Sequence, residues 1–166
     1  LDSLNKAMSA RKGQATDLII SYGDVLFNKY IPQALCQEKE DFVIFVDSDW
    51  QNQSSYARLG GFAECSLPNS KKAFNAKVYL KQLGDMVPKE QTHGVWMGFL
   101  KVSPAGSALL QTILATMMAD PANRKAGIPH LLQTLLNREQ PIRVLYTVGH
   151  WLDINSLDDV VQAGEF

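Results

Sequence analysis

The sequence predicts an α/β protein with a mixed, mostly parallel sheet flanked by helices. Segments of strand length alternate along the chain with segments whose apolar residues recur at helical spacing. Two predicted strands, residues 16–23 and 41–47, carry apolar residues at successive positions, which is typical of strands covered on both faces. Because a helical segment separates them, we expect a right-handed βαβ unit. With 166 residues, 46% of them hydrophobic, the chain is expected to form one domain over residues 1–166.

The first half of the chain begins with a helix, because Leu1, Leu4 and Met8 fall on one face at helical spacing. Asn28 and Pro32 stand where an N-cap and a first-turn proline of a second helix are expected. The elements expected here are a helix at 2–11, a central parallel strand at 16–23, a helix at 28–40 and a strand at 41–47.

The second half starts with a polar, irregular segment at 48–58. Further on, Ser103 and Pro104 have the residue types of an N-cap and a first helical position, and Ser156 and Gly164 those of a cap and a helix end. The expected elements are two short antiparallel strands at 60–67 and 76–83, a strand at 94–103, a helix at 104–119, a connection at 121–127, a helix at 128–139, a strand at 141–149 and a closing helix at 156–164.

Composition narrows the classes of function. The 16 basic and 17 acidic residues give a net charge of -1 and form no block of like charge, which argues against a nucleic-acid partner. The longest apolar runs have the length of strands, and the first residues lack the apolar core of a signal peptide. We therefore expect no membrane contact and a cytoplasmic location. Cys36 and Cys65 are accordingly expected to be reduced and mostly buried.

Asp24 is the first candidate functional residue. The apolar segment LIISYGDVLF, residues 18–27, delivers this carboxylate directly after Gly23. Ligands bind at the carboxyl edge of an α/β sheet, a glycine there permits close approach to the backbone, and one or two carboxylates suffice to hold Mg²⁺ beside phosphate and water. The alternative is that Asp24 only ends the strand or caps a turn.

The second candidate segment is HWLDINSLDD, residues 150–159. Asp153 and Asn155 are separated by one residue, so in extended backbone they project to the same side. Asp153 completes a metal site with Asp24 if the two strand ends meet. Alternatively, Asp153 and Asn155 organise the turn into the last helix.

A third candidate is the strand VIFVDSDW, which ends in Asp47-x-Asp49. Many glycosyltransferases use this arrangement to hold a divalent cation and a nucleotide-sugar diphosphate. Acids at such positions are more often solvated loop residues.

Aromatic residues accompany these strand ends. Tyr22, Trp50, Trp96 and Trp151 offer faces for an ammonium group, each contact contributing about 0.5–2 kcal/mol. For any one of them, burial in the core is the simpler interpretation.

Several segments together resemble one family. IISYGD with its apolar continuation, FVIFVDSDW, HGVWMGFLKVSPAGSALL and VLYTVGHWLDINSLDDVVQAGEF are similar to segments of the nucleotidyltransferases of phosphonate and choline-phosphate metabolism. The nearest resemblance is to the nucleotidyltransferase domain associated with phosphoenolpyruvate phosphomutase, and GHWLDINSLDD is its most specific part. It implies a nucleotide-diphospho-sugar-transferase-like fold that uses Mg²⁺ and transfers CMP from CTP to a phosphonate or phosphocholine-type acceptor, releasing pyrophosphate.

The resemblance also implies roles for individual residues. Asp24 matches the first metal-binding aspartate of the family, and the second lies in the stretch that holds Asp153 and Asn155, with the choice between them open. Trp96 lies where the family builds its head-group pocket. Tyr22, Gly23 and Trp151 are expected to contribute to substrate binding, and no side chain is assigned covalent chemistry.

The chain departs from the family at its start. The family opens with a glycine-rich loop that cradles the triphosphate, and nothing in residues 1–166 resembles it. We therefore expect an N-terminally truncated domain, the C-terminal two thirds of the family domain, with weak or absent transfer by this chain alone. Loss of the first strands would expose an edge beside LIISYG, so we expect a homo-oligomer that covers it.

Two other functions stay open. One is a non-catalytic protein of the same fold that binds a small ligand or a partner. The other is a glycosyltransferase built on Asp47-x-Asp49.

Overall fold

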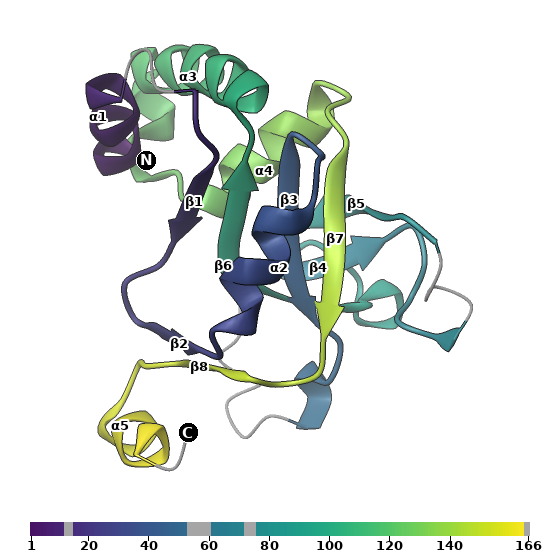
Figure 1. Cartoon of the computed structure of the whole chain (residues 1–166). Coiled ribbons are helices and arrows are strands. Elements are labelled where there is room, and N and C mark those ends of the chain that lie inside the picture. Colours follow the sequence, from purple (N-terminus) through teal and green to yellow (C-terminus); the bar gives the residue numbers. More distant parts are fainter. Residues whose placement is uncertain (12–14, 53–60, 72–75, 165–166) are drawn as a thin grey trace.

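A computed structural model describes residues 1–11, 15–52, 61–71 and 76–164. Its main feature is a six-stranded sheet with the strand order β1-β6-β3-β7-β5-β4. Strand β4 also pairs with β6, so five strands close into a small barrel, and β1 lies outside it on the edge of β6 (Figure 1). The strands are β1 (Leu18–Ser21), β3 (Phe42–Asp47), β4 (Phe62–Cys65), β5 (Val78–Leu83), β6 (Gly94–Val102) and β7 (Ile142–Thr147).

The sheet is mixed, but the prediction that it is mostly parallel is wrong. Among the described strands only β3 and β7 pair with each other in parallel, with Phe42 opposite Ile142 and Asp47 opposite Thr147. The other pairs are antiparallel. Continuous apolar runs arise here because the barrel interior covers one face of a strand and a helix covers the other. All nine residues of β6 are buried, although its described neighbours are antiparallel.

Strand β1 is an edge strand and not the central parallel strand expected from its sequence. It pairs antiparallel with β6, and so does β3, so β1 and β3 run in the same direction with β6 between them. Helix α2 (Tyr30–Gln37) lies on the connection, as expected for the βαβ pattern. Ile20 packs into the main core and Ile19 against a second cluster, which explains why both faces of this edge strand are apolar.

Two apolar clusters divide the core. Phe42, Ile44 and Val46 of β3 point into the main cluster, together with residues of three helices. Val43 and Phe45 point to the opposite face, where α2 covers them. The helices of the main cluster are α1 (Asp2–Ala10), α3 (Pro104–Ala119) and α4 (Ile128–Asn137); short 3₁₀ segments lie at Trp50–Asn52, Lys89–Gln91 and Pro121–Lys125.

Helix α3 begins as its sequence predicts. Ser103 is its N-cap, and the Ser103 hydroxyl accepts a hydrogen bond from the backbone N–H of Gly106 at 3.0 Å. Pro104 occupies the first helical turn. Both cysteines are free, as expected, but only Cys65 is buried, whereas Cys36 is exposed. No helix in the described ranges has the length and apolarity needed to cross a membrane.

A two-stranded ribbon forms beside the barrel. Strand β2 (Val25–Phe27) pairs antiparallel with β8 (Trp151–Asp153), so segments near opposite ends of the chain lie side by side (Figure 1). Helix α5 (Leu157–Ala163) follows β8. The predicted cap of this helix is confirmed, because the Ser156 hydroxyl accepts from the backbone N–H of Asp159, and the helix ends at Gly164.

Candidate functional site

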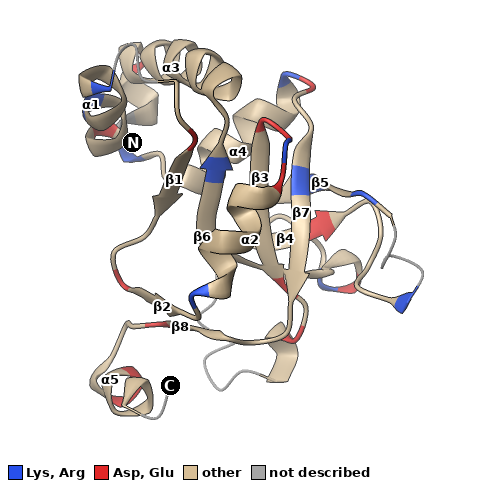
Figure 2. Cartoon of the chain, viewed as in Figure 1, with Lys and Arg blue, Asp and Glu red and all other residues tan. Residues whose placement is uncertain are grey.

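The ribbon brings Asp24 and Asp153 to the same place. Val25 lies opposite Asp153, and the carbonyl of Asp24 accepts a hydrogen bond from the backbone N–H of Ile154 at 2.8 Å. Burial raises the pKa of the neighbouring Tyr22 hydroxyl, and the charges of Asp24 and Asp153 raise it further. The two carboxylates therefore act on one common neighbour. Figure 2 shows acidic residues at the start of β2, on β8 and on α5.

Asn155 is a partner of Asp153. Its side-chain amide donates a hydrogen bond to one carboxylate oxygen of Asp153 at 2.7 Å. The backbone N–H of Asn155 in turn donates to the buried Asp159 carboxylate at 2.9 Å. Asn155 thus holds the carboxylate of Asp153 in place, while Asp153 itself reaches a cavity.

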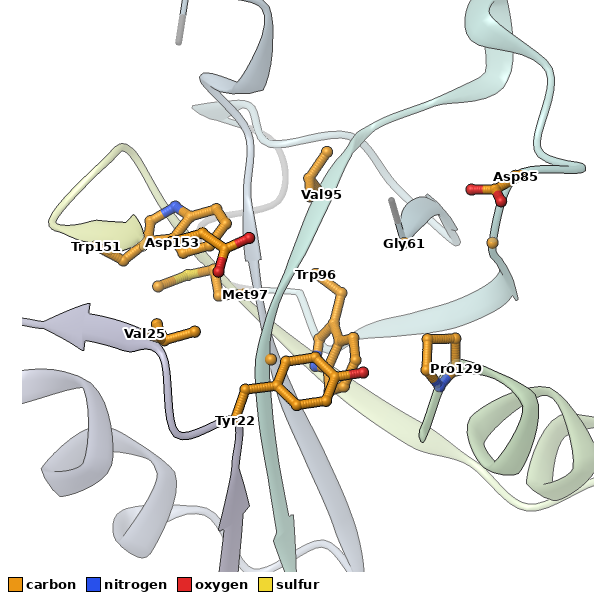
Figure 3. A pocket seen from close by; sticks show the side chains of 12 residues that line it. Tyr22, Val25, Gly61, Asp85, Val95, Trp96, Met97, Pro129, Trp151 and Asp153 are labelled. Carbon is orange, nitrogen blue, oxygen red and sulfur yellow. The ribbon is translucent and has the colours of Figure 1, made fainter. Parts of the chain in front are cut away.

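This cavity has a volume of about 280 Å³ and lies between the ribbon and β6 (Figure 3). Tyr22, Trp96 and Trp151 contribute aromatic walls, and Asp85 and Asp153 contribute carboxylates. The rings of Tyr22 and Trp96 meet edge to face, with centroids 5.4 Å apart. Three residues expected to bind substrate therefore line one cavity.

The other expected substrate residue, Gly23, is exposed in the turn between β1 and β2. A Cβ atom there would meet nothing within 4 Å, so packing within the chain does not require this glycine. Gly98 differs. Its φ is +82°, and a Cβ would lie 2.8 Å from Cδ2 of Tyr22, so the Tyr22 ring can rest against β6 only because residue 98 is glycine.

A hydrogen bond to Asp47 holds the Trp151 side chain in place. The indole N–H of Trp151 donates to Oδ2 of Asp47 at 2.8 Å, and Oδ1 accepts from the backbone N–H groups of Asp49 and Gly149. Asp47 is fully buried. The interpretation of Asp47-x-Asp49 as a nucleotide-sugar site is thereby corrected, because the first carboxylate is turned into the protein and holds the chain around the ribbon.

Trp50 and Asp49 also make contacts within the protein. Trp50 is buried and meets Phe62 edge to face at 5.3 Å, so it belongs to the packing of the barrel end and does not line the cavity. Oδ1 of Asp49 accepts from the amide of Asn52 at 2.6 Å. The simpler interpretation as a core residue is confirmed for Trp50, and it also holds for Trp96 and Trp151, which belong to the two apolar clusters and present only part of their rings to the cavity.

The acidic groups suit one class of metal ion. The described ranges contain no group of three or more His, Cys, Asp or Glu residues that could hold a metal ion. A closed zinc-type site is therefore not found in this part of the chain. Mg²⁺ differs because it usually keeps several waters and binds through one or two carboxylates together with substrate phosphates. Asp153 lines the cavity, and Asp24 lies beside it along the backbone, where its carbonyl accepts from the N–H of Ile154; two such carboxylates are what that pattern requires.

Sequence reasoning missed Asp85, which contributes the second carboxylate of the cavity. A signal for it was present. Gly84 and Asp85 directly follow β5, and Gly23 and Asp24 follow β1 after one further residue, Tyr22. The backbone at Gly84 has a φ of +119°, a conformation that favours glycine. A strand followed by Gly-Asp thus marks both places.

Comparisons with known proteins identify the fold. No family model matches the sequence, and no curated protein does so either. Among solved structures, a putative glucose-1-phosphate thymidylyltransferase from Bacillus anthracis aligns with 99% of this chain and 58% of its own, with a TM-score of 0.64 and 16% identity. The inositol-1-phosphate CTP transferase from T. maritima aligns with 95% of this chain and 57% of its own, with a TM-score of 0.61 and 12% identity.

A UDP-glucose pyrophosphorylase from Acinetobacter baumanii is similar too, at a TM-score of 0.65 and 11% identity, over 97% of this chain and 53% of its own. The chain thus has a nucleotidyltransferase fold and spans between 53% and 58% of the length of these similar structures. The fold expectation is confirmed at this level.

Proposed function

We propose that this chain forms the metal- and acceptor-binding part of a nucleotidyltransferase that transfers CMP from CTP to a phosphonate or phosphocholine-type acceptor. One observation carries the proposal. Asp153 of β8 lines a cavity with aromatic walls, and Asp24, distant in sequence, directly precedes β2 and acts with Asp153 on the same neighbour, Tyr22. The nucleotidyltransferase fold supports the reaction class, and the resemblance of GHWLDINSLDD and IISYGD supports the nucleotide and acceptor.

In this proposal Asp24 and Asp153 hold Mg²⁺, and Asn155 keeps the Asp153 carboxylate oriented through its amide. The bound ion would neutralise triphosphate charge. Asp153 is favoured over Asn155 as the ligand, because Asp153 lines the cavity and the amide N–H₂ of Asn155 faces Asp153.

The reaction requires orientation more than covalent chemistry. An acceptor oxygen attacks the α-phosphorus of CTP in line, a new P–O bond forms, and the bond to pyrophosphate breaks. Tyr22, Trp96 and Trp151 position the acceptor head group, and each aromatic contact with an ammonium group contributes about 0.5–2 kcal/mol. Gly23 leaves space for the nucleotide beside Asp24.

A non-catalytic ligand-binding protein is the second candidate. The described residues that line the cavity include no Lys or Arg, so no side chain of this lining neutralises a triphosphate. This alternative predicts that the chain binds a small acceptor but does not bind CTP.

Isothermal titration calorimetry with CTP and Mg²⁺ separates the two candidates. The proposed function predicts Mg²⁺-dependent binding that is lost in Asp24→Ala and kept in Asp158→Ala, because Asp158 lies exposed on α5 outside the cavity. Pyrophosphate release with 2-aminoethylphosphonate and with phosphocholine then identifies the acceptor. Wild-type protein that gives no heat with CTP and Mg²⁺ contradicts the proposed function.

We also propose a homo-oligomer. Strand β1 stands at the edge of the six-stranded sheet, and an uncovered edge strand favours pairing with another chain. A monomeric sedimentation profile at micromolar concentration would contradict this.

A further inference from the structure

We infer that Asp85 determines acceptor specificity by binding the ammonium group of a small zwitterionic acceptor. This inference rests on the proposed function, because it takes the cavity to be the acceptor site. It adds a recognition residue to that site and excludes sugar phosphates, which carry no ammonium group, as the preferred acceptor class.

The position of Asp85 is the first observation. Asp85 lies in the turn that follows β5, and its carboxylate is directed toward the cavity from the side opposite Asp153, with Trp96 between them (Figure 3). Within the described part of the chain, Asp85 makes no hydrogen bond or ion pair. Asp153, by contrast, accepts from Asn155. At one end of the cavity the Asp153 carboxylate is held by Asn155, and at the other end the Asp85 carboxylate can bind a ligand.

The hydrogen-bonding capacity of the walls is the second observation. Both indole N–H groups of the cavity are already used, because Trp96 donates to the carbonyl of Phe99 at 2.7 Å and Trp151 donates to Asp47. Among the side chains of the described lining, only the Tyr22 hydroxyl remains as a donor. The lining thus offers carboxylate acceptors and almost no donors, and it suits a ligand that brings its own N–H donors.

Charge gives the third observation. The charged groups of the described lining are Asp85 and Asp153, both acidic. An acceptor that is only anionic meets no opposite charge on these side chains. An ammonium group placed at Asp85 meets a carboxylate and the neighbouring aromatic rings, while the phosphonate or phosphate end extends toward Asp153, where bound Mg²⁺ would offset the negative charges. The cavity, at about 280 Å³, also suits a small acceptor.

Two isosteric probes test this inference by calorimetry on the full chain in Mg²⁺. 2-Aminoethylphosphonate and propylphosphonate have similar shape and differ in the ammonium group. Wild-type protein is expected to bind the aminated probe at least about ten-fold more tightly. Asp85→Asn should remove most of this preference by weakening the aminated probe alone. Glu90→Gln, an exposed acid nearby but outside the lining, should behave like wild type.

The outcomes separate this inference from the proposed function. Equal binding of both probes by wild type, a preference that persists in Asp85→Asn, or tighter binding of glucose 1-phosphate overturns the role of Asp85 and leaves nucleotidyl transfer standing. The expected preference without any binding of CTP in Mg²⁺ supports Asp85 and contradicts the proposed function. Failure of wild type to bind either probe overturns both.

Discussion

The barrel and the β2–β8 ribbon are built very differently. Strand β6 of the barrel has nine buried residues, whereas β2 and β8 have three residues each. On the ribbon side, Leu26 is 37% exposed, and Leu157 of α5 is 84% exposed. Yet the ribbon carries Asp24 and Asp153. Stability therefore comes mainly from the barrel, and the candidate metal ligands lie on the part that can open at lower cost.

Apolar packing of Val25 and Trp151 against β3 and β6 joins the two regions, and a small set of polar contacts adds to it. Asp47 ends β3 of the barrel and accepts from Trp151 of the ribbon. The hydroxyl groups of Tyr30 and Thr147 lie 2.6 Å apart, and so connect α2 with the end of β7. These contacts set where β8 leaves the barrel and thus where Asp153 lies.

The largest loss of stability is expected from a substitution in the barrel core, and α5 serves for comparison. Leu114 is fully buried in the main core, so Leu114→Ala should lower the free energy of unfolding by about 2–5 kcal/mol. Leu157→Ala is the matched control on α5 and should change it by less than about 0.5 kcal/mol. Urea denaturation followed by tryptophan fluorescence measures both. Similar losses in the two variants would show that α5 contributes to stability as much as the main core does.

The next effect tests the connection between the regions. Trp151→Phe keeps an aromatic ring but removes one donor to the buried Asp47 carboxylate, which should cost about 1–3 kcal/mol of unfolding free energy. Because the same contact fixes β8, ligand binding at the cavity should weaken too. A variant that is fully stable and binds normally would mean that Asp47 does not position the ribbon.

The sequence predicted the barrel elements better than the ribbon. Apolar runs and caps located α3, α4 and the strands, because burial and capping leave local signals at residues such as Ser103 and Ser156. Apolar runs did not reveal strand direction. The barrel interior buries one face of these antiparallel strands and the helices bury the other, so the strands are as apolar as parallel ones. The ribbon strands are too short to show a period, and their pairing depends on residues far apart in the chain.

For the candidate site, the residues Asp24 and Asp153 were predictable from their place after strands, and Tyr22, Trp96 and Trp151 from their aromatic character. The inward turn of Asp47 and the place of Asp85 at the cavity were not predicted. Whether a carboxylate at a strand end turns inward or into a cavity depends on tertiary contacts. For Asp47 these are the indole of Trp151 and the backbone of Gly149.

A smaller effect concerns α5 alone. Ser156→Ala removes the N-cap hydroxyl and should cost about 1 kcal/mol or less of helix stability. Because α5 contributes little to the core, hydrogen exchange should quicken in residues 157–163 while the urea midpoint stays nearly constant. A clear fall of the urea midpoint would contradict the prediction that α5 can open without unfolding the barrel.

The smallest effect lies at the far end of the barrel. A hydrogen bond from Lys77 lowers the pKa of Glu40 from 4.5 to about 2. This carboxylate therefore stabilises the fold above pH 4.5, and its contribution is lost as the pH falls from 4.5 toward 2. Glu40→Gln should remove that part of the acid dependence, by less than about 1 kcal/mol because Lys77 is exposed. Acid titrations of stability for both proteins measure it, and an unchanged profile would exclude Glu40 as the source.

We propose that Asp24 and Asp153 together form one cation site at the ribbon. Mn²⁺ binding followed by electron paramagnetic resonance tests it directly, with Mn²⁺ in place of Mg²⁺. Wild type should bind one ion, Asp24→Asn and Asp153→Asn should each weaken binding at least about ten-fold, and the double variant should be little worse than either, because both act on one site. Asp158→Asn should bind like wild type. Mn²⁺ binding that survives in both single variants, or that is absent from wild type, would contradict the claim.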